Sequence, residues 1–339
     1  MTGGSSGAYA GAGVDLEVSQ GVKREIRNAV ESTRTSLVRA GFGSFGGAFA
    51  LPAGFQEPVL VTSIDGVGTK LHLAIAWGRP AAAGRDLVNH CINDIAVLNA
   101  QPLAFQDYIA SGNLDAHIVR ALVEGMAEAC RAAGMALVGG ETAQMPDTYQ
   151  PGAYDLAGSI VGVVERRLLP SPETVRVGDV VLGLPATGPH TNGYSLARRT
   201  AEHLGRDFVF GGRSLADALL APHPSYLGEL QAAFAIPGVR VAAHITGGGL
   251  EENVPRVLPP AVAARLDVRS WQVPPVFELI QEDQAVELPE MFRVFNMGVG
   301  MVIVASAEAA DAVGRAIPAA FRAGEIIARG NKPVELANL

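Results

Sequence analysis

Apolar and polar positions alternate along this chain with two periods, which predict a mixture of strands and helices. Short apolar, β-branched runs at 58–64 (PVLVTSI) and 154–165 (YDLAGSIVGVVE) are typical of buried strands. Apolar residues spaced close to 3.6 positions apart predict helices over 18–34, 84–100 and 115–133. Because strands and helices intermix along the whole chain, the pattern predicts an α/β or α+β protein.

The pattern also indicates two domains. Residues 166–179 (RRLLPSPETVRVGD) contain two prolines and few apolar side chains, as a boundary between domains often does. After them the chain resumes with an apolar strand over 180–184. A length of 339 residues also suggests about two domains. We therefore expect an N-terminal domain over 1–170 and a C-terminal α+β domain over 171–339.

Composition excludes several classes of protein. The chain is 48% hydrophobic and 18% charged, which is enough for a large core, and its net charge is −8. An acidic balance argues against general nucleic-acid binding, and no apolar run is long enough to span a bilayer. No signal peptide is recognisable at the start, so we expect a cytoplasmic protein. Cys91 and Cys130 are far apart in apolar runs and are expected to be reduced core thiols.

Three acidic residues stand out by position. Asp65 follows an apolar strand and opens the stretch DGVGTK, and Glu141 follows Gly139 and Gly140, which we expect to end another strand. Asp94 lies on the polar stripe of the helix predicted over 84–100. A solvated turn or helix face explains each of them alone. Clustered carboxylates repel one another unless a cation neutralises them, so together they suggest a magnesium site.

The lysine of DGVGTK is unusual in this chain. Lys70 is one of only three lysines among 26 basic residues. Because this chain uses arginine for nearly all its positive charge, a lysine here suggests a function beyond keeping the surface soluble. The stretch is not a Walker A loop. Gly41, Gly43 and Gly46 match G-x-G-x-x-G, but no predicted strand precedes them and no helix follows. This segment is therefore read as a strand pair or a glycine-rich flap.

Two further loops carry candidate chemistry. In ITGGGLEENVPR three glycines lie between a strand and a helix, where backbone N–H groups can bind an anion. Asn253 and Arg256 follow on that helix and are expected to point toward the same anion. In GPHTNGYS, His190 and Asn192 occupy a glycine-bounded loop, and a plain surface histidine is the alternative interpretation.

The order and spacing of these motifs resemble one family. DGVGTK, Asn93-Asp94, GGET at 139–142, GPHTNGYSL, ITGGGLEEN and FNMGVGM at 295–301 together resemble the phosphoribosylformylglycinamidine cyclo-ligases, or AIR synthetases, of purine biosynthesis. The resemblance covers nearly the whole chain. It implies a two-domain fold of an ATP-binding superfamily, whose N-terminal domain pairs with a second copy so that the sheets of a homodimer form a β-barrel.

The resemblance also implies an activity and its residues. ATP and Mg²⁺ would phosphorylate the formyl oxygen of formylglycinamidine ribonucleotide, and an amine would then close the imidazole ring to give 5-aminoimidazole ribonucleotide, ADP and phosphate. Asp65 and Asp94 would bind metal and phosphate. The remaining expected site residues are the triphosphate loop Gly66, Gly68, Thr69 and Lys70, the catalytic candidates His190, Asn192, Glu141 and Lys70, and the substrate-phosphate turn Gly247, Gly248 and Gly249.

The sequence departs from the family pattern at two places, and other functions stay open. Gly11 replaces a usual acid, and Ser44 stands where a glycine is common. The alternatives are another kinase or synthetase of the superfamily, such as a selenophosphate synthetase, or a non-catalytic ATP-binding domain. A selenophosphate synthetase usually has a reactive cysteine near its N-terminus, whereas the first cysteine here is Cys91. No nucleic-acid or membrane partner is expected.

Overall fold

The computed structural model describes residues 16–339, with side chains from residue 20 onward. The departure at Gly11 therefore lies outside the described residues. The chain forms two compact units. The first comprises the described residues up to Phe55, Thr62–Cys91 and Pro102–Val163, and the second comprises Gln56–Val61, Ile92–Gln101 and Val164–Leu339. Helix α4 (Pro80–Ala96) contributes residues to both units.

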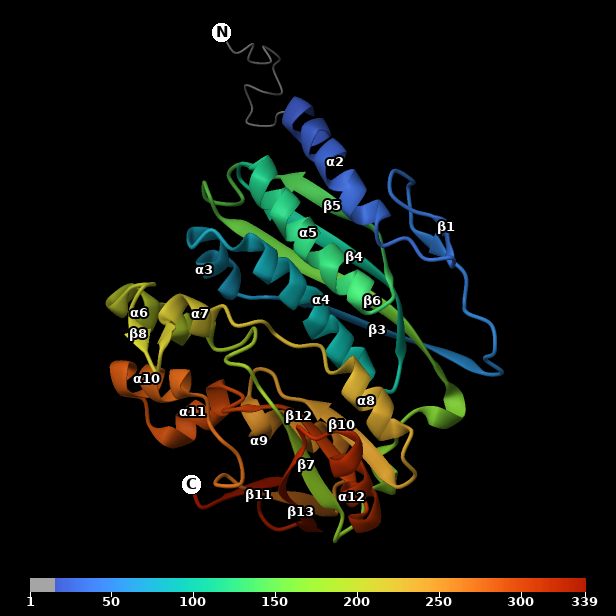
Figure 1. Cartoon of the computed structure of the whole chain (residues 1–339), viewed down its shortest axis with the longest axis vertical. Coiled ribbons are helices and arrows are strands. Elements are labelled where there is room, and N and C mark those ends of the chain that lie inside the picture. The colour runs from blue at the N-terminus through green and yellow to red at the C-terminus, as the bar shows by residue number, and fades with distance from the viewer. Residues whose placement is uncertain (1–15) are drawn as a thin grey trace. The chain divides into compact units, whose positions relative to one another are not determined.

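The first unit contains a four-stranded sheet with strand order β3-β6-β4-β5. Its helices α2, α4 and α5 lie along one face of this sheet (Figure 1). The strands and helices are β3 (Pro58–Gly66), β4 (Gln101–Ser111), β5 (Ala136–Gln144), β6 (Tyr154–Glu165), α2 (Leu16–Glu31), α3 (Lys70–Ala76) and α5 (Ala116–Ala132). A separate antiparallel pair, β1 (Val38–Ala40) and β2 (Ala48–Phe49), encloses the glycine-rich segment and Ser44. This segment is a strand pair, as one of the two interpretations predicted.

Helices α4 and α5 pack unusually closely because each has a glycine at the crossing. A Cβ atom on Gly84 would collide with the backbone oxygen of Leu122, and one on Gly125 would collide with that of Ala81.

Asp115 caps the start of α5, since its carboxylate accepts a 2.8 Å hydrogen bond from the N–H of His117. Cys91 and Cys130 are buried thiols, as predicted.

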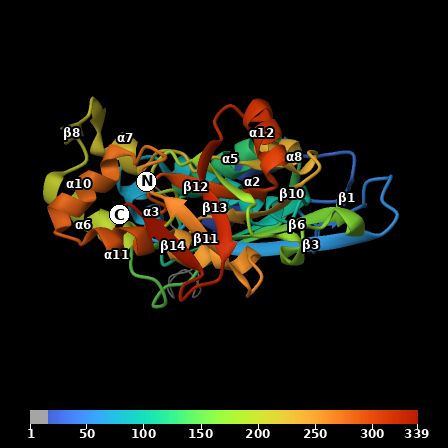
Figure 2. The same cartoon turned by 90° about the horizontal axis from the view of Figure 1, so that it is seen from below.

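The second unit is built on a six-stranded sheet with order β10-β12-β7-β13-β11-β14, seen from below in Figure 2. Its strands are β7 (Val180–Pro185), β10 (Val239–His244), β11 (Val262–Asp267), β12 (Val299–Ala305), β13 (Phe321–Ala328) and β14 (Val334–Ala337). Its helices are α6 (Tyr194–Leu204), α7 (Leu215–Leu219), α8 (Leu227–Phe234), α9 (Gly249–Asn253), α10 (Pro275–Gln284), α11 (Leu288–Val294) and α12 (Ala307–Ala316). A short hairpin, β8 (Val209–Phe210) and β9 (Arg213–Ser214), and the 3₁₀ turns at Arg166–Leu168, Pro172–Thr174 and Val254–Val257 complete it.

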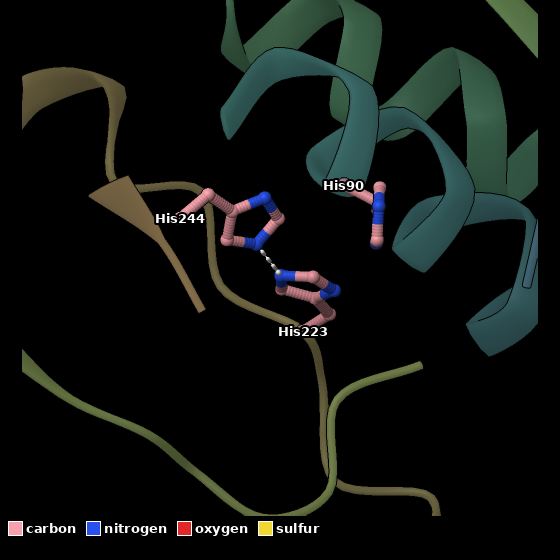
Figure 3. Close-up of side chains that lie close together, drawn as sticks. All are labelled: His90, His223 and His244. Atoms are coloured by element: carbon pink, nitrogen blue, oxygen red, sulfur yellow. Dashed lines mark hydrogen bonds between the residues drawn. The ribbon is translucent and has the colours of Figure 1, made fainter. Parts of the chain in front are cut away.

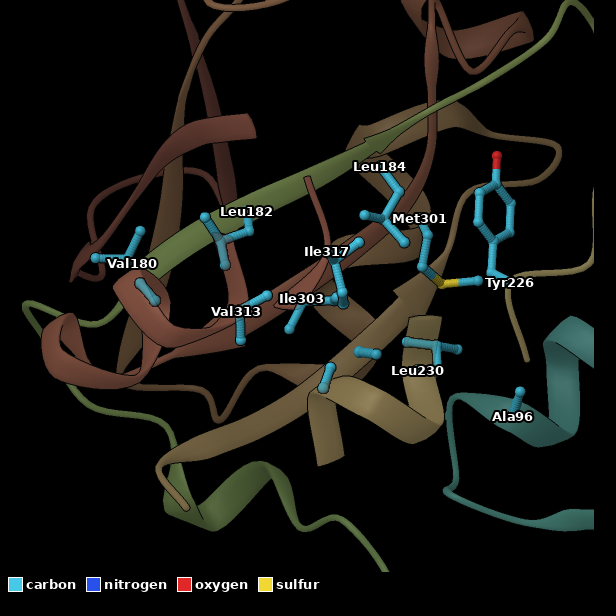
Figure 4. Close-up of a cluster of buried hydrophobic side chains, with 13 residues drawn as sticks. Ala96, Val180, Leu182, Leu184, Tyr226, Leu230, Met301, Ile303, Val313 and Ile317 are labelled. Atoms are coloured by element: carbon cyan, nitrogen blue, oxygen red, sulfur yellow. The ribbon is translucent and has the colours of Figure 1, made fainter. Parts of the chain in front are cut away.

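The core of the second unit lies between its sheet and helices α8 and α12. Leu182 and Leu184 from β7 contact Ile303 and Met301 from β12, and Leu230 from α8 closes the cluster (Figure 4). At roughly 1.5–3 kcal/mol for each large apolar side chain, this burial dominates the stability of the unit.

None of the helices within residues 16–339 combines the length and apolar character needed to span a bilayer.

The structure corrects several sequence-based expectations. Strand β5 does not end at Gly139 and Gly140 but continues to Gln144, because β4 pairs with it in parallel beyond a bulge at Val138. The polar stripe of α4 is not solvated, since Asp86, His90 and Asn93 are buried. The helix after the three glycines has only five residues before it tightens into a 3₁₀ turn. By contrast, the sheet of the first unit is open within the described residues of one chain, and the barrel expected of a homodimer stays a prediction.

Candidate functional site

The stretch DGVGTK forms a tight connection between a strand and a helix. Asp65 and Gly66 are the last residues of β3, and Lys70 is the first residue of α3. Gly68 has φ +52°, a left-handed conformation that glycine adopts without strain. A side chain on Gly66 would crowd the backbone oxygen of Leu156 at 3.1 Å. Both glycines therefore have structural reasons to be there, in addition to any phosphate they would admit.

Lys70 is not exposed in its loop. Its Nζ lies 2.5 Å from Asp86 Oδ2, and neither side chain has any exposed surface. Burial lowers the pKa of Lys70, and the carboxylate of Asp86 opposes this shift. Because one ionised partner compensates the other, the pair fixes the start of α3 against α4 within the first unit.

Asp65 remains accessible to solvent, unlike Asp86. Its side chain is 43% exposed, and Oδ2 lies 2.7 Å from Nε2 of the buried His90. Its Oδ1 accepts a 2.7 Å hydrogen bond from the N–H of Gly66. A carboxylate that is oriented by a histidine and a backbone N–H and still meets solvent suits a hard cation such as Mg²⁺.

Glu141 lies in the middle of β5 rather than at a strand end. Strands β3 and β5 are the two edges of the sheet, so Glu141 is separated from Asp65 by three strand spacings, or roughly 14 Å. The residue opposite Glu141 on β4 is Tyr108, and the preceding residue, Asp107, lies against Gly140. Burial and the charge of Glu141 raise the pKa of Asp107 to about 7. The structure thus places within range of the Glu141 charge an acid that sequence reasoning missed.

Asp94 belongs to a line of polar side chains inside the second unit. Its Oδ1 lies 2.9 Å from Nδ1 of His244, the last residue of β10. His244 Nε2 lies 3.2 Å from His223 Nε2, as Figure 3 shows. Asn93 Nδ2 reaches the same nitrogen of His223 at 3.1 Å. The acid predicted to bind metal is therefore oriented by a histidine, as metal-binding carboxylates commonly are.

His190 is a buried residue in a strained turn, not a surface histidine. Its side chain is 1% exposed and its φ is +58°, which for a non-glycine residue costs about 1–3 kcal/mol. Its ring stacks on His223 with centroids 4.2 Å apart and planes 15° apart. A Cβ atom on Gly300 would collide with Tyr226 and His190. Dense packing of this kind is what maintains a strained residue.

The three glycines of the ITGGGLEEN turn, Gly247 to Gly249, differ in the reason why glycine is required. Gly248 has φ +88° and Gly249 has φ +59°, and a Cβ atom on Gly249 would strike the backbone oxygen of Phe292. The requirement for glycine at these two positions is thus explained by conformation and packing. A Cβ atom on Gly247 would instead meet Asn192 Oδ1 at 3.3 Å. The structure therefore brings Gly247 and Asn192, both predicted site residues, side by side.

The expectation that Asn253 faces a bound anion is wrong. Asn253 is buried, and its Nδ2 donates hydrogen bonds to the backbone oxygens of Gly247 at 3.1 Å and Gly249 at 2.8 Å. Its side chain therefore stabilises the glycine turn from within. Arg256 is exposed in the 3₁₀ turn that follows.

The segment FNMGVGM connects both predicted substrate loops. Strand β12 pairs antiparallel with β10 on one side and with β7 on the other. The loops that follow β10 and β7 must therefore lie on either side of the start of β12. Asn296, just before that start, donates from Nδ2 to the backbone oxygen of Gly188 at 2.9 Å and accepts from the N–H of Gly298 at 2.9 Å. Phe295 packs against Gly193.

Sequence reasoning missed Asp86, Asp107, His223 and Asn296, and it gave His244 little weight. His223 lies in APHPSY, which matches no motif, and its partners Asn93 and His244 are 130 and 21 residues away. Asn296 lies in a motif that had been noted only for its resemblance. No local pattern indicates such long-range partners.

Comparisons with known proteins agree across the chain. The family model "AIR synthase related protein, N-terminal domain" matches residues 48–164, and the corresponding C-terminal domain model matches residues 176–336. A phosphoribosylformylglycinamidine cyclo-ligase of Bordetella petrii is 46% identical over 329 residues, which covers 95% of this chain and 94% of that protein.

Solved structures share the fold at lower identity. Hydrogenase maturation protein HypE of E. coli has a TM-score of 0.70 and 21% identity, covering 95% of this chain and 94% of its own. A HypE structure in complex with ATP has a TM-score of 0.69 and 17% identity, covering 93% of this chain and 91% of its own. The fold, the order of the motifs and the full-length match lead to one conclusion: this chain belongs to the phosphoribosylformylglycinamidine cyclo-ligase family, among the AIR synthase related proteins.

Proposed function

We propose that this protein closes the imidazole ring of formylglycinamidine ribonucleotide at the expense of ATP, giving 5-aminoimidazole ribonucleotide, ADP and phosphate. The observation that carries the proposal is the 46% identity to a cyclo-ligase over 95% of the chain. Such a function places the protein in purine biosynthesis and in the cytoplasm.

The chemistry explains why a ring closure would need ATP. The formyl oxygen is a poor leaving group, and transfer of the γ-phosphoryl group to it converts it into phosphate, which leaves readily. An amine nitrogen then attacks the formyl carbon, the carbon–oxygen bond breaks, and the nitrogen loses a proton. Catalysis of this kind depends mainly on positioning and on charge stabilisation.

Each unit contributes separate groups to this reaction. In the first, the DGVGTK connection (Asp65, Gly66, Gly68, Thr69 and Lys70) would bind the triphosphate, and Glu141 would act as a polar residue of the active site. In the second, Gly247 to Gly249 would bind the ribose 5-phosphate beside Asn192, and His190 would assist phosphoryl transfer or proton removal. Asp65 and Asp94 would bind Mg²⁺, which would neutralise phosphate charge.

A homodimer is part of the proposal. Ile64 of β3 is 74% exposed, and Leu60 on the same strand is 57% exposed. Large apolar side chains in a row on an open sheet favour an interface. A second copy of the chain paired here would cover them and close the two sheets into the barrel that the family resemblance implies. Sedimentation of the wild type and of Ile64→Asp tests this pairing.

The proposed activity is tested by incubating the protein with ATP, Mg²⁺ and formylglycinamidine ribonucleotide, and by measuring ADP and the aminoimidazole product. Selenide or thiamine monophosphate in place of the ribonucleotide serves as the control for other activities of the superfamily. Substrate labelled with ¹⁸O in its formyl group should deliver the label to inorganic phosphate. Label found in water alone would contradict phosphorylation of the formyl oxygen.

A further inference from the structure

His223 is a buried histidine that no motif marks, yet it contacts the predicted catalytic histidine directly. Its side chain has no exposed surface, and its ring covers one face of His190 with the two planes 15° apart. The edge of the His190 ring meets Gly300, where even a Cβ atom would not fit. The N–H of Thr187 points at His190 Nε2 at 3.4 Å. These contacts leave the His190 ring little freedom to rotate.

The orientation of the His223 ring is fixed from outside by Asn93. The N–H of Tyr226 donates to Asn93 Oδ1 at 2.8 Å, and Asn93 Nδ2 donates to the backbone oxygen of Pro224 at 2.9 Å. A backbone N–H can only donate and a backbone oxygen can only accept, so these two bonds determine which end of the Asn93 amide carries nitrogen. The oriented amide places Asn93 Nδ2 3.1 Å from His223 Nε2, so Asn93 contacts the edge of this ring.

A second contact holds the same edge of the His223 ring. His244 Nε2 lies 3.2 Å from His223 Nε2. His244 is in turn held by Asp94 at 2.9 Å. A continuous line of contacts thus runs from the predicted metal-binding carboxylate to the ring that packs on His190.

We propose that His223 is a positioning residue for His190, held in place by Asn93 and His244 and holding the His190 ring in its reactive orientation by stacking. The proposal rests on the proposed function insofar as His190 acts in that reaction. Small errors in the orientation of a catalytic group reduce turnover steeply, whereas substrate binding through the glycine turn and the DGVGTK connection does not involve His223.

The first test removes either the polar contacts of the His223 ring or the ring itself. His223→Phe keeps a ring against His190 but has no nitrogen to contact Asn93 and His244, and His223→Asn keeps a polar group but loses the ring. We expect both variants to lower kcat by about 10- to 100-fold with KM for ATP and ribonucleotide within about twofold of wild type. His117→Phe, at an exposed histidine of α5, is the matched control. A kcat equal to that of wild type in both folded variants would overturn the proposal.

The second test does not depend on activity. Proton NMR of the histidine rings, with the His190 signals identified by their absence in His190→Gln, should show His190 ring protons shifted upfield by the ring current of His223. This shift should be lost in His223→Asn. His190 ring protons at the same positions in wild type and in folded His223→Asn would refute the stacking. Absence of ATP-dependent product with the wild type would refute the proposed function instead and leave the NMR result standing.

Discussion

Lys70 and Asp86 form an ion pair with 2.5 Å between Nζ and Oδ2, entirely closed to solvent within the first unit. This relationship changes what a substitution at the lysine of DGVGTK would report. Loss of the ammonium would affect any contact with ATP, and it would also strand a buried carboxylate. The two effects have to be measured separately.

Lys70→Met should therefore lose both stability and activity. Removing one partner of a buried pair typically costs about 3–5 kcal/mol, so urea unfolding should show a loss of that order. The double variant Lys70→Met/Asp86→Leu should recover most of the stability and still lack activity. Lys332→Met, at an exposed lysine, is the control. A stable and fully active double variant would show that Lys70 has no role in ATP use.

Asp94→Asn should raise the magnesium concentration needed for half-maximal activity by about tenfold, because an amide is a much weaker ligand for a hard cation than a carboxylate. The amide oxygen can still accept from His244, so the free energy of unfolding should change little. Activity is measured across a magnesium titration, with Asp311→Asn at an exposed site as the control. Superimposable titrations would exclude Asp94 as a metal ligand.

Gly247→Ala should raise KM for the ribonucleotide by about tenfold and leave KM for ATP within twofold, because a methyl group would enter the space beside Asn192. This position is a better probe than Gly248, whose φ of +88° makes any side chain strained regardless of a ligand. Gly46→Ala is the matched control, since a Cβ atom there has open space around it. Unchanged kinetics for the ribonucleotide would argue against a phosphate at this turn.

Asn296→Ala should destabilise the second unit by about 1–3 kcal/mol, because the buried backbone oxygen of Gly188 would lose its donor. Turnover should also fall, since Gly188 begins the loop that carries His190. Thermal unfolding and steady-state kinetics measure the two effects. Asn28→Ala on the exposed face of α2 should alter neither. Wild-type values in both measurements would show that Asn296 does not brace this loop.

The Asp107 carboxyl group should make the free energy of unfolding depend on pH. Burial and Glu141 raise its pKa from an ordinary value of 3.8 to about 7, so between these values the folded chain retains a proton that the unfolded chain has lost. This contribution to stability is complete below pH 3.8 and disappears as pH rises through about 7. Because the side chain is partly accessible, the loss should be about 1–2 kcal/mol, well below the full value of the shift.

Asp107→Asn should abolish this dependence. Urea unfolding at pH 5 and pH 8 should show that the asparagine variant gains stability relative to the wild type as pH rises. Asp311→Asn, at an exposed carboxylate on α12, should show no such difference. The same stability difference between Asp107→Asn and wild type at both pH values would contradict the assignment.

The sequence by itself determined the elements and the motifs. Strand β6 has the predicted bounds of 154–165, and α5 differs from its prediction by one residue at each end, because local periodicity governs whether a segment forms a strand or a helix. Where local signals compete, prediction was weaker: the glycines at 139 and 140 suggested a strand end, yet pairing with β4 carries β5 past them. The order of the motifs was also enough to predict the family.

Only the tertiary structure decided which side chains meet. Asp86 lies 16 residues from Lys70 on another helix, Asn93 reaches His223 across 130 residues, and Asn296 reaches Gly188 across 108. From the sequence, the polar residues on α4 were expected to form a solvated face. In the structure they are buried, because partners in distant segments satisfy their hydrogen-bonding groups. Helical spacing is a local property of the chain, whereas the burial and pairing of a polar group depend on contacts that exist only once the chain has folded.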